Sequence, residues 1–279
     1  MISVRNNIPT LISSRYIGIA NDAVKKSLAK LSTGKRINSA ADDPAGLAIS
    51  NRLKTQIDGM EQAKNNTLQG ISLLSTAEGG TYQITSALHR LNSLAIEASN
   101  GTLTYTDRAL IQNEVDQLVS EVDRLSSVTT FNGIQLLKGS TVVGTGSIQI
   151  QAGYESGSKI SINLATTTTA SLGISGLSVA GTDTAAAESA ITLIQTAIGT
   201  VAQNESKIGA LQNRMNYAAD FLDTQRINTS SALSVIEDTD FATELTNYTQ
   251  NTMLVQSATS VMAQSNAVSK EVLTLLGIG

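Results

Sequence analysis

Few residues of this chain could carry acid–base, nucleophilic or metal chemistry, and they do not converge. His89 is the only histidine and there is no cysteine, which excludes thiolate nucleophiles and thiolate-bound zinc. A Ser-His-Asp triad would need His89, yet no glycine-rich nucleophile turn stands elsewhere to meet it. We therefore interpret His89 as a surface or interface residue, and we expect no metal, no cofactor and no enzymatic activity.

Two further fragments resemble functional motifs but have simpler interpretations. The run 33–35, Thr-Gly-Lys, is similar to the end of a P-loop, but Ala29 stands where that motif needs its first glycine and Arg36 where it needs Ser or Thr. The acidic pair Asp42-Asp43 precedes Pro44. Asp at the N-cap and Pro at the first position favour a helix start, so capping explains this pair better than catalysis does.

The composition is unusual for a chain of 279 residues. Aromatic residues make up 3%, there is no tryptophan, and charged residues make up 15% with a net charge of −4. This balance favours long helices packed through small side chains and gives no attraction to nucleic acid. We find no apolar run long enough to cross a bilayer and no Sec-type signal peptide, so neither membrane nor nucleic-acid binding is expected.

The elements that must position any functional residue are mostly helices. Apolar residues recur at helical spacing from Ile17 to Leu125 and again from Ile191 to Leu276. We predict helix starts capped by Asp43, Asp107 and Asp240, and we interpret Gly79-Gly80 as a loosened spot within one long helix.

Between these helical regions lies a stretch rich in Gly, Ser and Thr, residues 139–185. Alternating apolar and polar residues at 147–151 and 159–164 predict a β-hairpin, and the run from Thr166 onward predicts an exposed loop. The predicted fold class is therefore mainly α: a long antiparallel helical bundle or coiled coil from both chain ends, with a small β-hairpin in the middle.

Several motifs resemble those of bacterial flagellin. At the N-terminal side these are the run 31–50, Leu-Ser-Thr-Gly-Lys-Arg-Ile-Asn-Ser-Ala-Ala-Asp-Asp-Pro-Ala-Gly-Leu-Ala-Ile-Ser, and Phe131-Asn132-Gly133 followed by Leu136-Leu137. At the C-terminal side they are the runs 236–245 and 272–277. The resemblance covers about residues 10–140 and 190–279, and the short middle implies a minimal form without large outer domains.

The resemblance implies a structural subunit of the flagellar filament that self-assembles into a helical polymer for swimming motility. It implies filament-core helices at residues 1–42 and 238–279 and a shell at residues 43–237, with the hairpin near 140–165. The residues expected to pack in the filament core are Ile17, Val24, Leu31, Phe241, Leu245, Val255, Met262, Val272 and Leu275. The alternatives are a hook–filament junction protein, a filament-embedded enzyme and a generic coiled-coil adapter.

The resemblance also implies partners and a location. The subunit is expected outside the cell, in a homopolymer, after passage through the flagellar export machinery and in contact with the filament cap and hook-associated proteins. An export chaperone on the C-terminal helix and a host Toll-like receptor are further expected partners. Receptor contact would use Arg90, Leu94 and Glu114, although Asn92-Ser93 replaces the more usual Arg-Glu pair.

Overall fold

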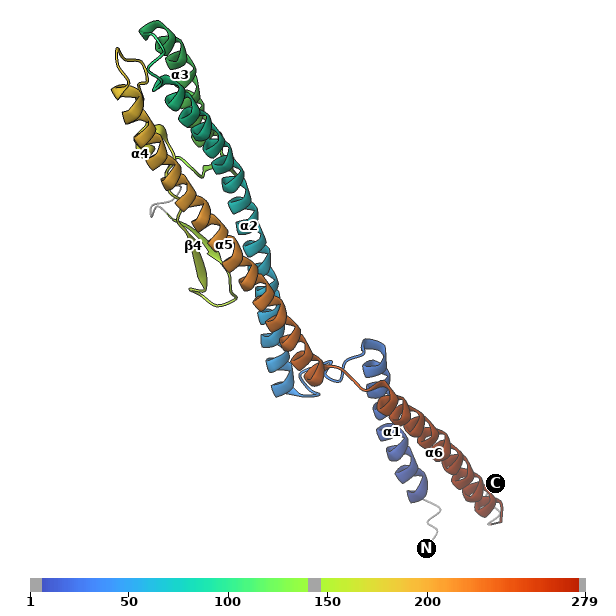
Figure 1. The fold of residues 1–279 in the computed structure, drawn as a ribbon. Helices are drawn as coiled ribbons and strands as arrows, with labels where there is room; N and C mark the ends of the chain where they lie inside the picture. The colour runs from blue at the N-terminus through green and yellow to red at the C-terminus, as the bar shows by residue number, and fades with distance from the viewer. Residues whose placement is uncertain (1–6, 140–146, 276–279) are drawn as a thin grey trace. The chain divides into compact units, whose positions relative to one another are not determined.

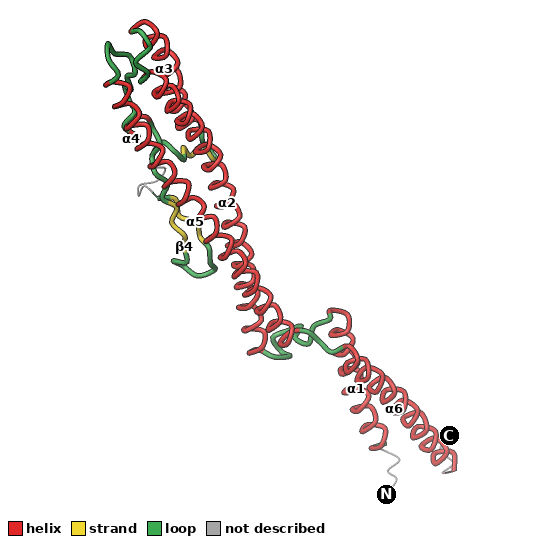
Figure 2. Tube along the Cα trace, in the orientation of Figure 1, coloured by secondary structure: helices red, strands yellow, loops and turns green. Residues whose placement is uncertain are grey.

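The computed structural model describes residues 7–139 and 147–275, with side chains as far as residue 271. The helices are α1 (Ile8–Thr33), α2 (Pro44–Ala98), α3 (Tyr105–Val128), α4 (Thr169–Leu172), α5 (Ala185–Glu237) and α6 (Phe241–Leu275) (Figure 1). The strands are β1 (Thr130–Phe131), β2 (Ile134–Gln135), β3 (Ile148–Gln151) and β4 (Lys159–Ile162) (Figure 2). The predicted mainly-α class with a small hairpin is confirmed.

The chain divides into two units. One combines both chain ends, Met1–Ile57 and Ile227–Gly279, and the other is the continuous segment Asp58–Arg226. The division falls inside α2 and α5, so the first turns of α2 and the last turns of α5 belong with the terminal helices. The predicted filament-core helices at residues 1–42 and 238–279, and the predicted shell at residues 43–237, concern the assembled filament and stay a prediction.

Local capping chemistry explains where the helices begin. Asp43 accepts the backbone N–H of Gly46 at 2.9 Å, and Asp240 accepts that of Ala242 at 2.9 Å, which confirms both predicted caps. The prediction that Asp107 is the N-cap of its helix was wrong. Thr104 is the N-cap, and Asp107 lies in the first turn, where its carboxylate accepts the Thr104 N–H at 2.9 Å in a capping box.

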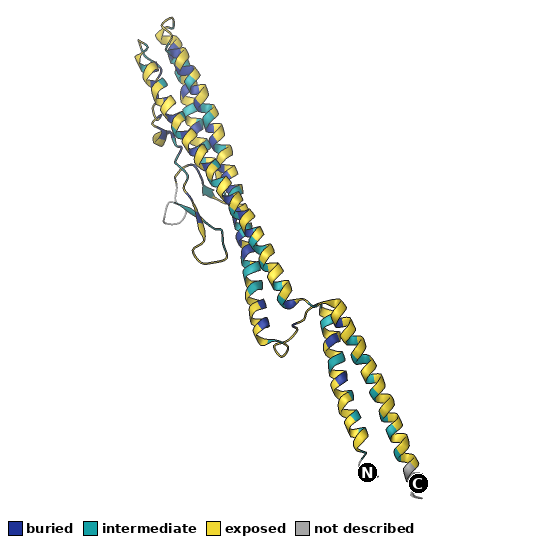
Figure 3. Ribbon diagram, turned by 60° about the horizontal axis from the view of Figure 1, so that its bottom comes forward, coloured by how far each residue is buried: buried dark blue, intermediate teal, exposed yellow. Residues whose placement is uncertain are grey.

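In the unit Asp58–Arg226, α2, α3 and α5 lie side by side around one apolar core (Figures 1 and 3). Each helix contributes residues at its predicted heptad spacing, which confirms the helical seams. The fully buried side chains include Leu74, Ile84, Leu88, Leu91, Val115, Ile194, Ile208 and Met215. Large aliphatic side chains fill this core, and no aromatic residue is buried within the described part of the chain.

Gly79 and Gly80 lie within α2, which continues unbroken through both. A Cβ atom on Gly80 would lie 2.5 Å from Thr129 Oγ1 and 3.0 Å from Leu137 Cδ1, whereas a Cβ on Gly79 would meet nothing within 4 Å. Gly80 therefore allows the segment after α3 to approach α2 closely. The expected loosened spot is a point of close packing.

The segment after α3 contains a tight hairpin that the sequence analysis missed. β1 and β2 pair antiparallel, with Phe131 opposite Ile134, and are joined by Asn132-Gly133. Both turn residues have positive φ, 49° and 78°, as a two-residue type I′ turn requires, and Asn-Gly is the preferred sequence for it. The Phe131-Asn132-Gly133 motif, which follows α3, thus reverses the direction of the chain.

The predicted hairpin of the middle segment is confirmed, but the predicted loop after it is wrong in part. β3 and β4 pair antiparallel, with Ile148 opposite Ile162 and Ile150 opposite Ile160. The run from Thr166 includes α4 and several buried side chains, Thr167, Thr169, Leu172, Ile174, Leu177 and Val179. These side chains cover one side of the helical core, a role that their irregular spacing concealed.

A buried arginine closes the turn between α2 and α3. Arg108 is 3% exposed, and its guanidinium donates to the carbonyl oxygens of Ala98 at 2.9 Å, Gly181 at 3.2 Å and Asn100 at 3.3 Å. Because a buried cation is costly without partners, this fork of donors fixes three chain segments at one point.

The expectation that no apolar run could cross a membrane was too strict. Of the helices in the described residues, α5 alone is long and apolar enough by length and composition. Its richness in Ala, Ile, Val and Leu produces this result, and the helix supplies Ile194, Val201, Ile208 and Met215 to the core described above.

A pair of alanine substitutions tests the packing at the double glycine. Gly80→Ala is expected to lower the free energy of unfolding by about 1–3 kcal/mol, because the new methyl group displaces Thr129 and Leu137. Gly79→Ala is the matched control and is expected to raise that free energy by about 0.5–1 kcal/mol through helix propensity alone. Urea unfolding followed by circular dichroism measures both, and equal stabilisation by the two variants would contradict the close approach.

Candidate functional site

The terminal helices α1 and α6 pack against each other along one seam (Figure 1). On α1, Ala20 and Ser27 are buried, and the predicted core positions Ile17, Val24 and Leu31 are half-buried. These residues step by three and four along one helix face, as their spacing predicts. The seam is shallow, because the buried residues of α1 carry only small side chains.

On α6 the predicted core positions divide into two groups. Val255 and Met262 are half-buried in the seam. Phe241 and Leu245 are 57% and 56% exposed, so they lie outside it in the single chain. Two further predicted positions have side chains outside the described residues, Val272 and Leu275. Packing of all these residues inside a filament stays a prediction.

Polar contacts supplement the seam. The Thr10 hydroxyl donates to Ser265 Oγ at 3.2 Å, and Lys30 Nζ lies 3.6 Å from a carboxylate oxygen of Glu244, which is 8% exposed. Neutral hydrogen bonds such as that of Thr10 contribute about 0.5–1.5 kcal/mol each. They fix the register of the two helices more than they stabilise the pair.

A second set of apolar side chains on the same two helices lacks a partner. We call this set, whose members lie on more than one side of each helix, the outer apolar face, and every member is at least 47% exposed. On α1 it comprises Ile8, Leu11, Ile12, Tyr16, Ile19 and Leu28. On α6 it comprises Phe241, Leu245, Met253, Leu254, Val261 and Val268. Single exposed apolar residues are ordinary, but a set that extends along two helices indicates an interaction surface.

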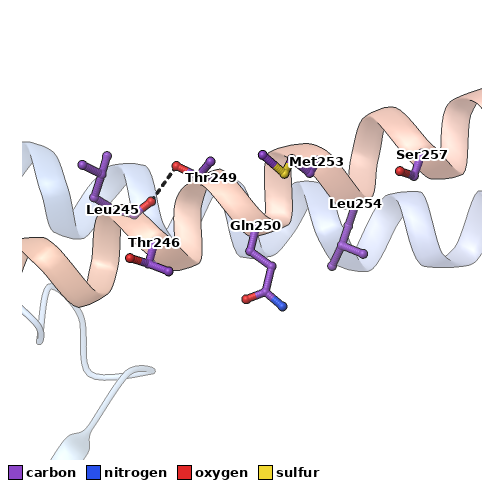
Figure 4. A pocket seen from close by; sticks show the side chains of 7 residues that line it. All are labelled: Leu245, Thr246, Thr249, Gln250, Met253, Leu254 and Ser257. Atoms are coloured by element: carbon purple, nitrogen blue, oxygen red, sulfur yellow. Dashed lines mark hydrogen bonds between the residues drawn. The ribbon is translucent and has the colours of Figure 1, made fainter.

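Part of the outer apolar face is a hollow along α6 of about 520 Å³, lined by Leu245, Thr246, Thr249, Gln250, Met253, Leu254 and Ser257 (Figure 4). The Thr249 hydroxyl donates to the Leu245 carbonyl at 2.8 Å, which satisfies its polar atom within the helix. Leu254 also lines a second hollow, of about 230 Å³, between α6 and the Tyr16 side of α1. The surface is thus indented and can accept apolar side chains.

The outer apolar face is accompanied by an absence of charge. From Leu245 to Ser269 the sequence contains no Asp, Glu, Lys or Arg. Identical copies packed around α6 would therefore meet no like-charge repulsion along this stretch. This run is the sequence signal that the heptad analysis overlooked.

A buried ionic cluster lies where the terminal helices join the rest of their unit. Glu237 is 4% exposed. Its Oε1 lies 2.6 Å from Lys35 Nζ, and its Oε2 lies 2.6 Å from Lys54 Nζ. Burial raises the pKa of Glu237, but the hydrogen bonds from Lys35 and Lys54 outweigh it and hold this pKa below its ordinary 4.5. We call these three residues the lysine–glutamate joint; sequence analysis gave no sign of it.

The two halves of the chain match known protein families. Residues 4–141 match the bacterial flagellin N-terminal helical region, and residues 191–276 match the bacterial flagellin C-terminal helical region. This chain belongs to the bacterial flagellin family.

Curated relatives match over almost their whole length. The flagellar filament 31.3 kDa core protein of Treponema maltophilum is 36% identical over 287 residues, 98% of this chain and 99% of that protein. A flagellin of Halalkalibacterium halodurans is 37% identical over 273 residues, with the same coverage of both chains.

Solved structures agree with the fold. The crystal structure of Bacillus cereus flagellin is 30% identical with a TM-score of 0.51, covering 61% of this chain and 94% of that one. A Vibrio parahaemolyticus protein described as flagellar hook-associated has a TM-score of 0.60 but 15% identity, over 70% of this chain and 99% of its own. At that identity the likeness shows a shared fold alone.

The three residues expected at a receptor contact of this flagellin-family chain do not share one surface. Arg90 Nε donates to Glu114 Oε1 at 2.8 Å, which joins α2 to α3 through two side chains that are 55% and 46% exposed. Leu94 is 2% exposed and belongs to the core. In the folded chain Leu94 cannot offer its side chain to a partner, because it lies on the face of α2 that the other helices cover.

The acidic pair Asp42-Asp43 has a structural role, and His89 is exposed on α2. Asp42 accepts the backbone N–H groups of Asn38 and Ser39 at 3.2 and 3.0 Å, so it organises the turn before α2. Among the residues that the structure describes, no group of His, Cys, Asp and Glu is arranged to hold a metal ion. The assembly surface on α1 and α6 is the remaining candidate for function.

An ion pair between α2 and α5 generates a pH prediction. Lys64 Nζ lies 2.5 Å from Asp223 and holds the pKa of that carboxyl below its ordinary 3.8. Since the folded chain then binds this proton more weakly than the unfolded chain, the stability that the pair contributes is present above pH 3.8 and is lost as the pH falls through the lowered value.

Lys64→Met is expected to raise the pKa of Asp223, measured by NMR titration of chains with labelled aspartate carboxyls. Lys207→Met removes an equal charge from the exposed side of α5, about 24 Å along the helix from Asp223, and is the control. An Asp223 pKa unchanged by Lys64→Met would contradict the pairing.

Proposed function

We propose that this chain, as a structural subunit of the bacterial flagellar filament, assembles with other copies through the outer apolar face of α1 and α6. The observation that carries the proposal is this face itself: an indented apolar surface on two helices, accompanied by an uncharged stretch of α6. Burial of apolar surface contributes about 25 cal/mol per Å², so covering the face drives association.

The polymer is proposed to be helical and open-ended. A contact between two different patches of identical subunits does not close on itself unless the rotation between copies happens to form a ring. The name of the Treponema relative, a filament core protein, supports the same arrangement. Residues 1–42 and 238–279 are proposed as the filament core and residues 43–237 as the shell that surrounds it.

The proposal extends to the setting of the filament. Flagellin-family membership supports a place outside the cell, passage through the flagellar export machinery and contact with the filament cap and hook-associated proteins. An export chaperone would find exposed apolar side chains on α6 before assembly. For a Toll-like receptor, the exposed Arg90–Glu114 pair is the part of the expected contact that remains available. The chain is proposed to act structurally and not as an enzyme.

A hook–filament junction role is the alternative. The relatives that match nearly the full length are named as flagellins and filament core proteins, and the likeness to a hook-associated protein lies at the level of fold. Copy number separates the two roles, because a filament subunit forms the dominant band of sheared flagella.

A substitution in the α6 hollow tests the assembly surface. Leu254→Glu is expected to raise the critical concentration for seeded polymerisation by more than about tenfold, because each contact would bury a charge without a partner. Leu254→Met keeps the apolar surface and is the matched control, expected to polymerise like the unaltered chain. Normal polymerisation of Leu254→Glu would exclude the α6 hollow from the contact.

Hydrogen exchange tests the coupling of order to assembly. The shallow seam leaves α1 and α6 with too little buried apolar surface to persist alone, so their amides are expected to exchange rapidly in dilute monomer and slowly in filaments. Amides around Leu88 and Val115 in the core of Asp58–Arg226 are expected to be slow in both states. Strong protection of α1 and α6 in dilute monomer would overturn this expectation.

A further inference from the structure

We infer that Glu237 is a positioning residue for assembly: through the lysine–glutamate joint it fixes the two linkers in register, so that α1 and α6 present the outer apolar face as one unit. The inference rests on the proposed function, because it concerns how the same surface is oriented. It assigns a role to residues that lie outside the apolar face itself.

The joint brings together segments that are far apart in the sequence. Glu237 ends α5 just before the linker 238–240, Lys35 lies in the linker 34–43 that follows α1, and Lys54 lies on α2. One buried carboxylate therefore holds both linkers and the first turns of α2. The side chains of Lys35 and Lys54 are 46% and 38% exposed, far more than that of Glu237. Glu237 is therefore the central member.

Backbone hydrogen bonds align the two linkers beside the joint. The Arg36 N–H donates to the Glu237 carbonyl at 2.6 Å, and the Thr239 N–H donates to the Gly34 carbonyl at 3.0 Å. Lys35 and Asp238 form an antiparallel bridge between these bonds. The linkers thus have a defined register, as paired strands do.

The register matters because it sets the direction in which the helices face. If a slip in the linkers moves the following helix by one residue along the seam, that helix must rotate by about 100° to keep its contacts, since a helix has about 3.6 residues per turn. Such a rotation would turn Leu254 or Ile19 away from the neighbouring copy that it is proposed to contact. The seam between α1 and α6 is shallow and carries few large buried side chains, so it resists a slip weakly.

A buried carboxylate with two cations suits this task. Apolar contacts tolerate small displacements, whereas a buried charge that loses its partners is strongly destabilising. The lysine–glutamate joint is therefore satisfied in one register and strongly penalised in the others. Because a buried ion pair adds little net stability, we assign this one a role in fixing the register of the linkers.

The test compares Glu237→Gln with a matched control, Glu121→Gln. Glu121 forms an ion pair with Arg124 at 2.6 Å on the surface of α3, with side chains 40% and 58% exposed. Glu237→Gln removes the same charge, but from the joint, where it pairs with both Lys35 and Lys54. It is expected to raise the critical concentration of seeded polymerisation at least about tenfold, whereas Glu121→Gln leaves it within about twofold.

A readout specific to positioning is the double-mutant cycle with Lys35→Met. If both residues act through one joint, Lys35→Met raises the critical concentration in the unaltered chain but adds little to Glu237→Gln. Hydrogen exchange in the filaments of Glu237→Gln is expected to accelerate at the Arg36 and Thr239 amides. Circular dichroism of the monomer, which reports mainly on the core of Asp58–Arg226, is expected to be unchanged.

The possible outcomes are distinct. Polymerisation of Glu237→Gln at the unaltered critical concentration, or full additivity of the two substitutions, overturns the role of Glu237 and leaves the proposed function standing. Failure of the unaltered chain to polymerise on filament seeds overturns the proposed function instead. Because Lys35 is half exposed, Lys35→Met provides the test of the joint even if Glu237→Gln folds poorly.

Discussion

Two packed helices share one seam, and each helix can bury only one of its faces there. If the helices are apolar on more than one face, the other apolar faces stay exposed. This constraint governs the terminal unit. The seam between α1 and α6 takes up Ala20, Ser27 and half-buried aliphatic residues, and it leaves the outer apolar face to solvent. The proposed function follows from this exposed apolar surface, which we propose further copies of the same helices cover.

The unit Asp58–Arg226 resolves the same problem within a single chain. There α2, α3 and α5 enclose a common core, and the segment after β4 covers a side that helices alone leave open. Arg108 and Gly80 serve this closure, one by tying three carbonyl groups together and the other by admitting a neighbouring segment. This region has a closed core within one chain, whereas the terminal pair leaves large apolar side chains exposed.

Charge is distributed in keeping with this division. It is absent from Leu245 to Ser269, where copies are proposed to pack, and it is concentrated in the joint of Glu237 with its two lysines. The uncharged surface supplies attraction without direction, because burial of apolar area is not directional. The ionic joint supplies direction with little attraction. Together they are the basis of the association in one orientation that we propose.

The sequence by itself determined the helices, the β3–β4 hairpin and the caps at Asp43 and Asp240, because periodicity and capping act within a few residues. The family motifs likewise identified a filament subunit. Only the tertiary structure decided which apolar faces have partners. Helical spacing places Leu94 and Leu245 equally well on an apolar stripe, yet the first is buried and the second exposed. Glu237 met its lysines only through folding, since contacts between residues so far apart in the chain depend on how whole helices pack and leave no local pattern.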